Sequence, residues 1–196
     1  YLNYWFEMVK SFMTEIFQIE KITFYILTDE VEQVRKYGEI LGANLSIHAI
    51  PPYRWPEATL FRYREILNIQ ESIYEDILIY LDADMLIKTD FLKSLEPDKW
   101  LHDIALVSHP GYWRPKKGNL IKFYLKAPKF LLKDLWRVLS TGGIGAWETN
   151  SSSKAYVRRS QRKEYVCGGV WFGKRNQLLL MIDECSKNVD IDYKIG

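Results

Sequence analysis

Two aspartates separated by a single alanine directly follow the apolar run 77–81. Such a run is typical of a strand buried in a parallel sheet. Two carboxylates crowded at a strand end repel each other unless a cation or solvent relieves them. Their hard oxygen atoms suit Mg²⁺ or Mn²⁺, ions that also contact phosphate groups. The pattern therefore predicts a metal site at Asp82 and Asp84, against the plainer alternative of a structural loop.

The elements that position these aspartates follow from hydrophobic periodicity. Residues 1–17 have apolar side chains at helical spacing, and the β-branched and aromatic run 21–28 predicts a strand. Further patterns predict helices over 30–41 and 56–73 and strands over 45–50 and 76–81. This alternation is the order of an open α/β sheet flanked by helices, whose ligands bind beyond the carboxyl ends of its strands.

Length and composition narrow the class of protein. The 196 residues suit one domain, and 47% hydrophobic residues with a net charge of only +2 exclude a disordered chain. That charge gives no indication of nucleic-acid binding. Two cysteines form no disulfide framework, and no apolar run reaches the roughly 18 residues of a membrane span. These features allow a cytoplasmic setting, and a start at Tyr1 without methionine indicates a fragment.

The second half of the chain contains several short motifs of aromatic and small residues. His109 and Tyr112 enclose a proline and a glycine, Trp147 precedes Glu148, and residues 167–169 read Cys-Gly-Gly. Aromatic faces suit stacking on sugar rings and nucleobases, and a neutral imidazole both donates and accepts hydrogen bonds. The plainer interpretation is core packing for the aromatic rings and a backbone turn for the paired glycines.

Taken in order, these motifs resemble the α1,3-galactosyl- and N-acetylgalactosaminyltransferases that include the blood-group A and B enzymes, glycosyltransferase family 6, in a microbial or viral-type member. The resemblance covers residues 1–196. It is carried by residues 23–29, 54–55, 82–84, 109–112, 147–156 and 167–173. It implies one GT-A-like catalytic domain truncated at both ends, with 1–99 mainly the UDP-sugar donor half and 100–196 mainly the acceptor half.

The resemblance also implies an activity. The enzyme would move N-acetylgalactosamine or galactose from a UDP-sugar, in α1,3 linkage and with retention, to a galactose-containing glycan, fucosylated or plain. Mn²⁺ or Mg²⁺ bound through Asp82 and Asp84 would act as a Lewis acid and offset charge on the departing UDP. The setting would be cytoplasmic for a microbial member and the Golgi lumen for a eukaryotic one.

Residue roles follow from the same resemblance. Tyr1 would stack on uracil, and Arg62, with Arg64 as the alternative, would hold the nucleotide. The remaining donor-binding residues would be Asp82, Ala83, Asp84, Cys167, Gly168 and Gly169. The acceptor-binding residues would be His109, Gly111, Tyr112, Trp147 and Glu148. Trp147 stands where the family more usually has tyrosine.

Glycine at 111 and 169 borders the donor sugar in this comparison. Because glycine leaves space for an acetamido group, UDP-N-acetylgalactosamine is the expected donor.

Two departures from the family limit these expectations. The catalytic glutamate belongs to a Trp-His-Asp-Glu segment expected beyond Gly196, so no catalytic residue is assigned. Residues 114–146 form an insertion of apolar and basic residues where mammalian members have only a few. It could cap the acceptor cleft, touch an anionic membrane surface, pair with another subunit or form an ordinary packed helix.

Two other functions fit the same residues. One is a metal-dependent transferase of another GT-A family, such as the glycogenin-like enzymes, which share the donor fold. The other is a glycan-binding module without turnover.

Overall fold

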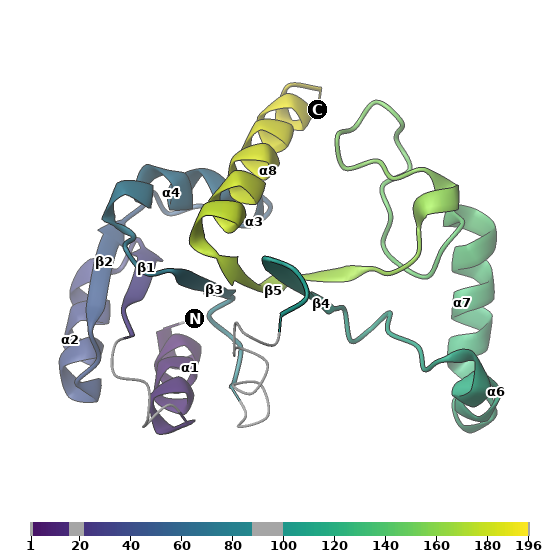
Figure 1. Ribbon diagram of the computed structural model, residues 1–196, viewed down its shortest axis with the longest axis horizontal. Coiled ribbons are helices and arrows are strands. Elements are labelled where there is room, and N and C mark those ends of the chain that lie inside the picture. The colour runs from purple at the N-terminus through teal and green to yellow at the C-terminus, as the bar shows by residue number, and fades with distance from the viewer. Residues whose placement is uncertain (1, 16–21, 88–99, 196) are drawn as a thin grey trace. The chain divides into compact units, whose positions relative to one another are not determined.

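Helices and strands alternate along the chain, which confirms the α/β class. The computed structural model describes residues 2–15, 22–87 and 100–195, drawn as ribbons in Figure 1. The elements are α1 (Leu2–Glu15), β1 (Phe24–Thr28), α2 (Val31–Leu41), β2 (Leu45–Ala49), α3 (Glu57–Leu60), α4 (Arg62–Asn68), η1 (Gln70–Ser72), β3 (Ile77–Leu81), β4 (Ile104–Ser108), α6 (Lys117–Lys126), α7 (Pro128–Thr141), η4 (Arg159–Gln161), β5 (Val166–Lys174) and α8 (Arg175–Ile195). None of the described helices is both long and apolar enough to cross a membrane.

The chain folds as two compact units. The first comprises Tyr1–Ala105 and Phe172–Ser186, and the second comprises Leu106–Trp171 and Lys187–Gly196. Strands β4 and β5 and helix α8 each run from one unit into the other along the chain. The first unit contains the predicted metal motif, and the second contains the predicted acceptor segments.

The first unit is built on the parallel strands β1 and β2. Phe24 pairs with Leu45 at one end, and Thr28 pairs with Ala49 at the other. Helix α2 connects the two strands and lies beside them in Figure 1. It ends at Gly42, whose φ of 62° is a left-handed conformation that glycine adopts without strain. The strands and helices predicted before residue 50 are confirmed.

A small core fixes the end of β3. Trp5, Met8 and Val9 of α1 are buried together with Val34 of α2. Leu81, the last residue of β3, and Ala83 pack against this cluster. The backbone that carries the two aspartates is therefore anchored on both sides of Asp82.

Strand β3 belongs to a second sheet, in which β5 lies between β3 and β4. The helix predicted over 56–73 is divided into α3, α4 and η1, with the buried Phe61 at the first division. The ring of Phe61 packs edge-on against Tyr53, with 5.4 Å between the ring centroids.

The insertion of the second unit contains a helical hairpin of α6 and α7. Pro128 stands at the first position of α7, where its missing N–H costs no helical hydrogen bond. Gly142, at a φ of 76°, ends the helix. Part of the insertion is thus a regular pair of helices.

The polar loop around Ser153 is attached to the last turns of α8 within the second unit. Asp192 accepts hydrogen bonds from the backbone N of Lys154 at 2.7 Å and from Ser153 Oγ at 2.6 Å. These bonds, that of Lys154 first, hold the pKa of Asp192 below its ordinary value.

Candidate functional site

The carboxylate of Asp82 at the end of β3 is oriented by two donors. Its Oδ1 atom accepts hydrogen bonds from Arg62 Nη1 at 3.0 Å and from Tyr80 Oη at 2.8 Å. Arg62 also lies 5.2 Å above the ring of Tyr80 and donates from Nε to the carbonyl of Thr59 at 2.8 Å. Burial, with the nearby charge of Asp82, raises the pKa of Tyr80, so its phenol stays protonated as a donor. The predicted residues Arg62 and Asp82 therefore meet directly.

Asp84 lies in the turn that follows β3, and its side chain is exposed. Within the described residues, Oδ2 of Asp82 and the carboxylate of Asp84 make no hydrogen bond or ion pair. Mg²⁺ in proteins is commonly bound by one or two carboxylates, with waters and substrate phosphates as the other ligands. The donor set of Asp82 and Asp84 fits such an ion.

Protein side chains of the described residues do not make a complete metal site by themselves. Residues 2–15, 22–87 and 100–195 contain no group of three or more His, Cys, Asp or Glu side chains placed to hold a metal. Among these residues, Asp82 and Asp84 would leave positions on an ion for oxygen atoms of a phosphate-bearing molecule or of water.

The structure separates the two arginines considered for the nucleotide. Arg64 donates to Tyr53 Oη at 3.1 Å and lies 4.1 Å above the ring of Phe61. Arg62 is thus the arginine beside the aspartates. Tyr1, predicted to stack on uracil, lies outside the described residues.

In the second unit, His109 begins a tight turn whose hydrogen bonds define the roles of its ring nitrogens. Its carbonyl accepts hydrogen bonds from the backbone N of Tyr112 at 2.9 Å and of Trp113 at 2.8 Å. Its ring Nδ1 lies 3.0 Å from the backbone N of Gly111, which donates to it. In a neutral imidazole the proton then resides on Nε2, which becomes a donor.

Three of the predicted acceptor residues meet around Tyr165. The ring centroids of His109 and Tyr112 are 4.7 Å apart, those of Tyr112 and Tyr165 are 5.0 Å apart, and those of Trp147 and Tyr165 are 5.1 Å apart. The two tyrosines pack edge to face, as do Trp147 and Tyr165, an arrangement that aromatic quadrupoles favour. We call these four residues the aromatic cluster.

Two glycines leave the room that the indole of Trp147 occupies. A β-carbon at Gly143 would lie 2.9 Å from Trp147 Nε1, and one at Gly145 would lie 2.6 Å from it. Nε1 is itself buried and has no hydrogen-bond partner among the described residues. Because a buried indole N–H usually finds a partner, this donor is an unmet polar group in the aromatic cluster.

A buried arginine supports the backbone beside the aromatic cluster. Arg162 is 8% exposed and donates to the carbonyls of Val157 at 2.7 Å, Glu148 at 2.9 Å and Thr141. Its guanidinium lies 5.3 Å from the ring of Tyr156. Arg162 therefore connects the end of α7 with the backbone at Glu148 and at Val157.

The side chain of Glu148 is exposed and accepts from its own loop. Its Oε1 atom lies 2.6 Å from the backbone N of Thr149 and 2.6 Å from that of Asn150. These bonds set the direction of the carboxylate predicted to face the acceptor.

The predicted donor residues of the second unit lie on β5. Cys167 is a half-buried free thiol, and Gly169 is buried. A β-carbon at Gly168 would meet nothing within 4 Å, and the carbonyl of this glycine accepts a hydrogen bond from Trp171 Nε1 at 3.1 Å. Gly168 is therefore an open backbone position.

The absence of a side chain at Gly111 leaves room for the imidazole ring of His109. A β-carbon there would lie 3.2 Å from Cε1 of His109, a contact that forces the neighbour to shift. A larger residue at 111 would press directly on the imidazole.

A buried ion pair connects the insertion to the turn of His109. Arg114 donates from Nη2 to Asp134 Oδ1 at 2.7 Å and from Nε to Oδ2 at 2.5 Å, and Tyr124 Oη donates to Oδ2 at 3.0 Å. Arg137 lies 3.6 Å from Asp134 and 4.6 Å above the ring of Tyr112. Arg137 of the hairpin thus contacts Tyr112 of the aromatic cluster, and it shares the carboxylate of Asp134 with Arg114, which precedes the hairpin.

The environment of Asp134 keeps it ionised. Burial alone would favour the neutral acid, but the hydrogen bonds from Arg114 and Tyr124 hold the pKa of Asp134 below its ordinary value. The same pairing raises the pKa of Arg114.

Sequence reasoning missed Tyr165, Arg162 and the ion pair of Arg114 with Asp134. The signal for Asp134 was available, because it is the only acidic residue in 114–146. Arg162 follows other basic residues in a segment that looks like a solvated loop, so its burial had no sequence signal. The described residues also form a hollow of about 430 Å³ lined by α4, η1 and α8, and none of the predicted site residues lines it.

Comparison with known proteins assigns no family to this arrangement. No protein-family model matches the chain, and a search of curated proteins finds no match.

Proposed function

We propose that the chain is a metal-dependent, retaining glycosyltransferase with a GT-A-like fold. It transfers N-acetylgalactosamine or galactose from a UDP-sugar, in α1,3 linkage, to a galactose-containing glycan. The motif resemblance motivates the proposal. The observation that carries it is the arrangement at the end of β3, where Arg62 and Tyr80 orient Asp82 and the exposed Asp84 follows two residues later.

On the donor side, Asp82 and Asp84 would bind Mn²⁺ or Mg²⁺ together with the diphosphate. The ion supplies Lewis-acid stabilisation of the charge that develops on UDP. Arg62 fixes the orientation of Asp82 and adds positive charge beside the phosphates. Tyr80 remains a neutral donor to the same carboxylate, so it adds no competing negative charge.

On the acceptor side, the aromatic cluster supports recognition of a galactose. An aromatic face such as that of Trp147 packs against the apolar face of a sugar. The Nε2–H of His109 donates to a sugar hydroxyl, because Nδ1 is already occupied by the backbone of Gly111.

One observation favours the alternative of a glycan-binding module. The aromatic cluster, Arg162 and the ion pair of the insertion all belong to the second unit, which could bind a sugar without a donor. Transfer assays with UDP-N-acetylgalactosamine and UDP-galactose against fucosylated and plain galactosides separate the two functions. Binding of galactosides without any transfer by the full-length protein would favour the module.

The metal role is tested by calorimetry of UDP binding to the chain with Mn²⁺ and with EDTA. Changes near metal ligands cost about 10–100-fold in metal affinity, so both EDTA and Asp84→Asn should weaken UDP binding at least about tenfold. Glu39→Gln removes one exposed negative charge from α2 of the same unit and serves as the matched control. Equal UDP affinity with and without EDTA, or in Asp84→Asn, would exclude a metal at this pair.

A further inference from the structure

Helix α7 exposes an apolar stripe and buries the carboxylate of Asp134 on the opposite side. The spacing i, i+3, i+4, i+7 places four large apolar side chains on one face of the helix. These side chains, the α7 stripe, are Leu132 (72% exposed), Leu135 (54%), Trp136 (68%) and Leu139 (71%). The opposite side carries Asp134 and Arg137, which belong to the buried ion pair. Because an amphipathic helix normally packs its apolar stripe on a core, the α7 stripe indicates a partner surface.

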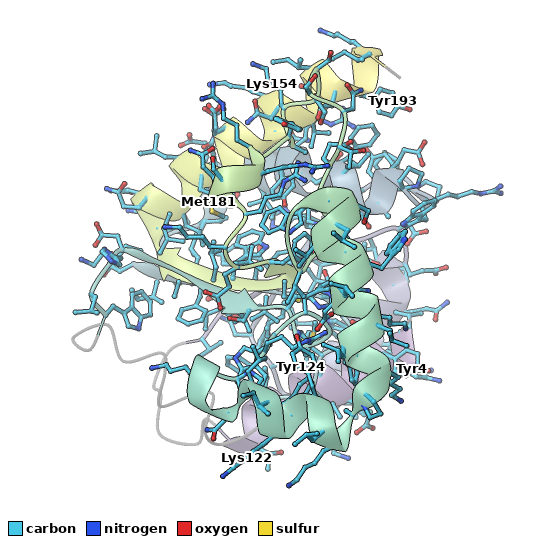
Figure 2. All side chains as sticks on the ribbon, turned by 90° about the vertical axis from the view of Figure 1, so that its right-hand side faces the viewer. Tyr4, Lys122, Tyr124, Lys154, Met181 and Tyr193 are labelled. Atoms are coloured by element: carbon cyan, nitrogen blue, oxygen red, sulfur yellow. The ribbon has the colours of Figure 1, made fainter. Side chains whose placement is uncertain are left out.

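Helix α6 extends the same kind of surface. Ile121 and Leu125, one turn apart, are 72% and 78% exposed. Lys126 directly follows Leu125, and Lys122 directly follows Ile121; both lysines are exposed. Figure 2 shows Lys122 extending outward from α6, whereas Tyr124 is directed to α7, consistent with its bond to Asp134.

The charges around these apolar side chains have one sign. Residues 114–146 contain eight Lys and Arg and one Asp, a net charge of +7, whereas the whole chain carries +2, so the rest of the chain carries −5. The single acidic residue, Asp134, is 3% exposed and paired. On the outside, Lys129 and Lys133 follow one edge of the α7 stripe, and both are exposed. The outer surface of the hairpin is therefore apolar and basic.

We propose that the α6–α7 hairpin docks on an anionic lipid bilayer surface. The α7 stripe enters the headgroup region, and the lysines contact the lipid phosphates and carboxylates. Trp136 lies on the side of the stripe nearest Lys129 and Lys133, which suits the preference of tryptophan for the membrane interface. A second copy of the chain is a poorer occupant, since its residues 114–146 would bring +7 against +7. The inference depends on the hairpin alone and is independent of the proposed transferase activity.

The test is co-sedimentation of the full chain with vesicles. One set contains phosphatidylcholine alone, and the other contains equal parts of phosphatidylcholine and phosphatidylserine. Binding is expected only with phosphatidylserine, and it should weaken as salt is added, because counter-ions screen the lysines.

Two variants separate the apolar and the charged contributions. Lys129→Gln with Lys133→Gln should weaken binding about 10- to 30-fold, from about fivefold per basic residue near an anionic surface. Leu132→Gln with Leu139→Gln should abolish insertion while leaving the lysines in place. All four residues are exposed, so the fold should persist, as circular dichroism would verify. Leu101→Gln with Lys36→Gln, at two exposed positions of the first unit, is the matched control.

Three results would overturn the proposal. The first is no binding to either vesicle, and the second is equal binding to both. The third is sedimentation as a dimer that Leu132→Gln with Leu139→Gln converts to a monomer, which would make a second copy the occupant of the hairpin.

Discussion

At the scale of the residue, the ring of His109 has a fixed hydrogen-bond polarity. Gly111 donates its backbone N–H to Nδ1, so the neutral ring presents a donor at Nε2. A sugar hydroxyl that meets this atom must accept. The turn that creates this polarity depends on residues 109–113, whose backbone bonds close on the His109 carbonyl.

We expect His109→Ala to damage acceptor use and to leave UDP binding unchanged. A lost hydrogen bond to a buried sugar hydroxyl costs about 1–3 kcal/mol, which lowers kcat/KM for the acceptor accordingly. His109→Asn keeps a side-chain acceptor for the Gly111 N–H but lacks Nε2, so it should preserve the turn and still lose acceptor use. A parallel loss of UDP affinity, measured by calorimetry, would assign His109 to the donor side or to the fold.

The expected choice between the two donor sugars also depends on single residues. We expect UDP-N-acetylgalactosamine to be preferred over UDP-galactose, and Gly169→Ala to reduce that preference. A methyl-sized change in a pocket wall is worth about 1–3 kcal/mol, so some use of UDP-galactose should persist. The measurement is kcat/KM for both donors in the full-length protein. A wild-type preference for UDP-galactose, or no change in Gly169→Ala, would contradict the assignment.

Gly111→Ala is the comparison variant for donor choice. Because its β-carbon would press on the His109 ring, it should alter acceptor use more than donor choice.

At the scale of the element, a buried ion pair holds α7 against the rest of its unit. Its inner side carries Asp134, which binds Arg114, Tyr124 and Arg137. Removing one partner of a buried ion pair leaves an uncompensated charge, whereas replacing both with apolar residues is often neutral. The position of α7 should therefore depend on one carboxylate.

We expect Asp134→Asn to lower the free energy of unfolding by about 3–5 kcal/mol. Replacing both partners, in Arg114→Met with Asp134→Leu, should cost less than either single change. Because the folded pKa of Asp134 is below its ordinary value, its contribution is complete above the ordinary carboxyl pKa and is lost as pH falls through the lowered value. Urea unfolding across acidic pH measures this contribution to the free energy of unfolding. The same pH dependence in Asp134→Asn as in the wild type would show that Asp134 does not stabilise the fold.

Helices and strands whose apolar residues recur with a clear period were predictable from the sequence, and others were not. The apolar run 77–81 before Asp82 predicted β3, and the spacing of apolar residues predicted α1 and α2. Helix α8 was missed because its buried residues, Leu178, Ile182 and Ser186, form a stripe of only one residue per turn.

The candidate site shows the same limit. Asp82, Asp84 and His109 stood out by type and spacing. Tyr165, which packs against His109, and Arg162, which donates to the Glu148 carbonyl, are defined by long-range contacts, which carry no local pattern.

At the scale of the whole molecule, α8 belongs to both units. Leu178, fully buried, lies in its first part, and Asp192, which binds the loop at Ser153, lies in its last turns. One helix thus contributes a core residue to one unit and a loop anchor to the other.

We expect substitutions along α8 to act on different units. Leu178→Ala should cost about 2–5 kcal/mol and lower hydrogen-exchange protection in the first unit. Asp192→Ala should lower protection at Lys154 and Ala155 in the second unit, because it removes the acceptor for those backbone N–H groups. Mass spectrometry of deuterium uptake distinguishes the regions. A uniform loss of protection over both units in either variant would show that they unfold as one.

The glycines beside Trp147 have a consequence for how this sequence can change over time. Since a β-carbon at 143 or at 145 would overlap the indole nitrogen, neither position tolerates any other amino acid while the tryptophan stays in place. A smaller residue at 147 would not release both constraints equally, because a β-carbon at 145 would still lie 2.7 Å from Cδ2 of Tyr165, whereas one at 143 would lie 3.0 Å from Cβ of Arg162. A library randomised at these three positions and selected for folding should therefore return glycine at 143 and 145 with tryptophan, and with alanine or serine at 147 it should admit other residues at 143 before it admits them at 145.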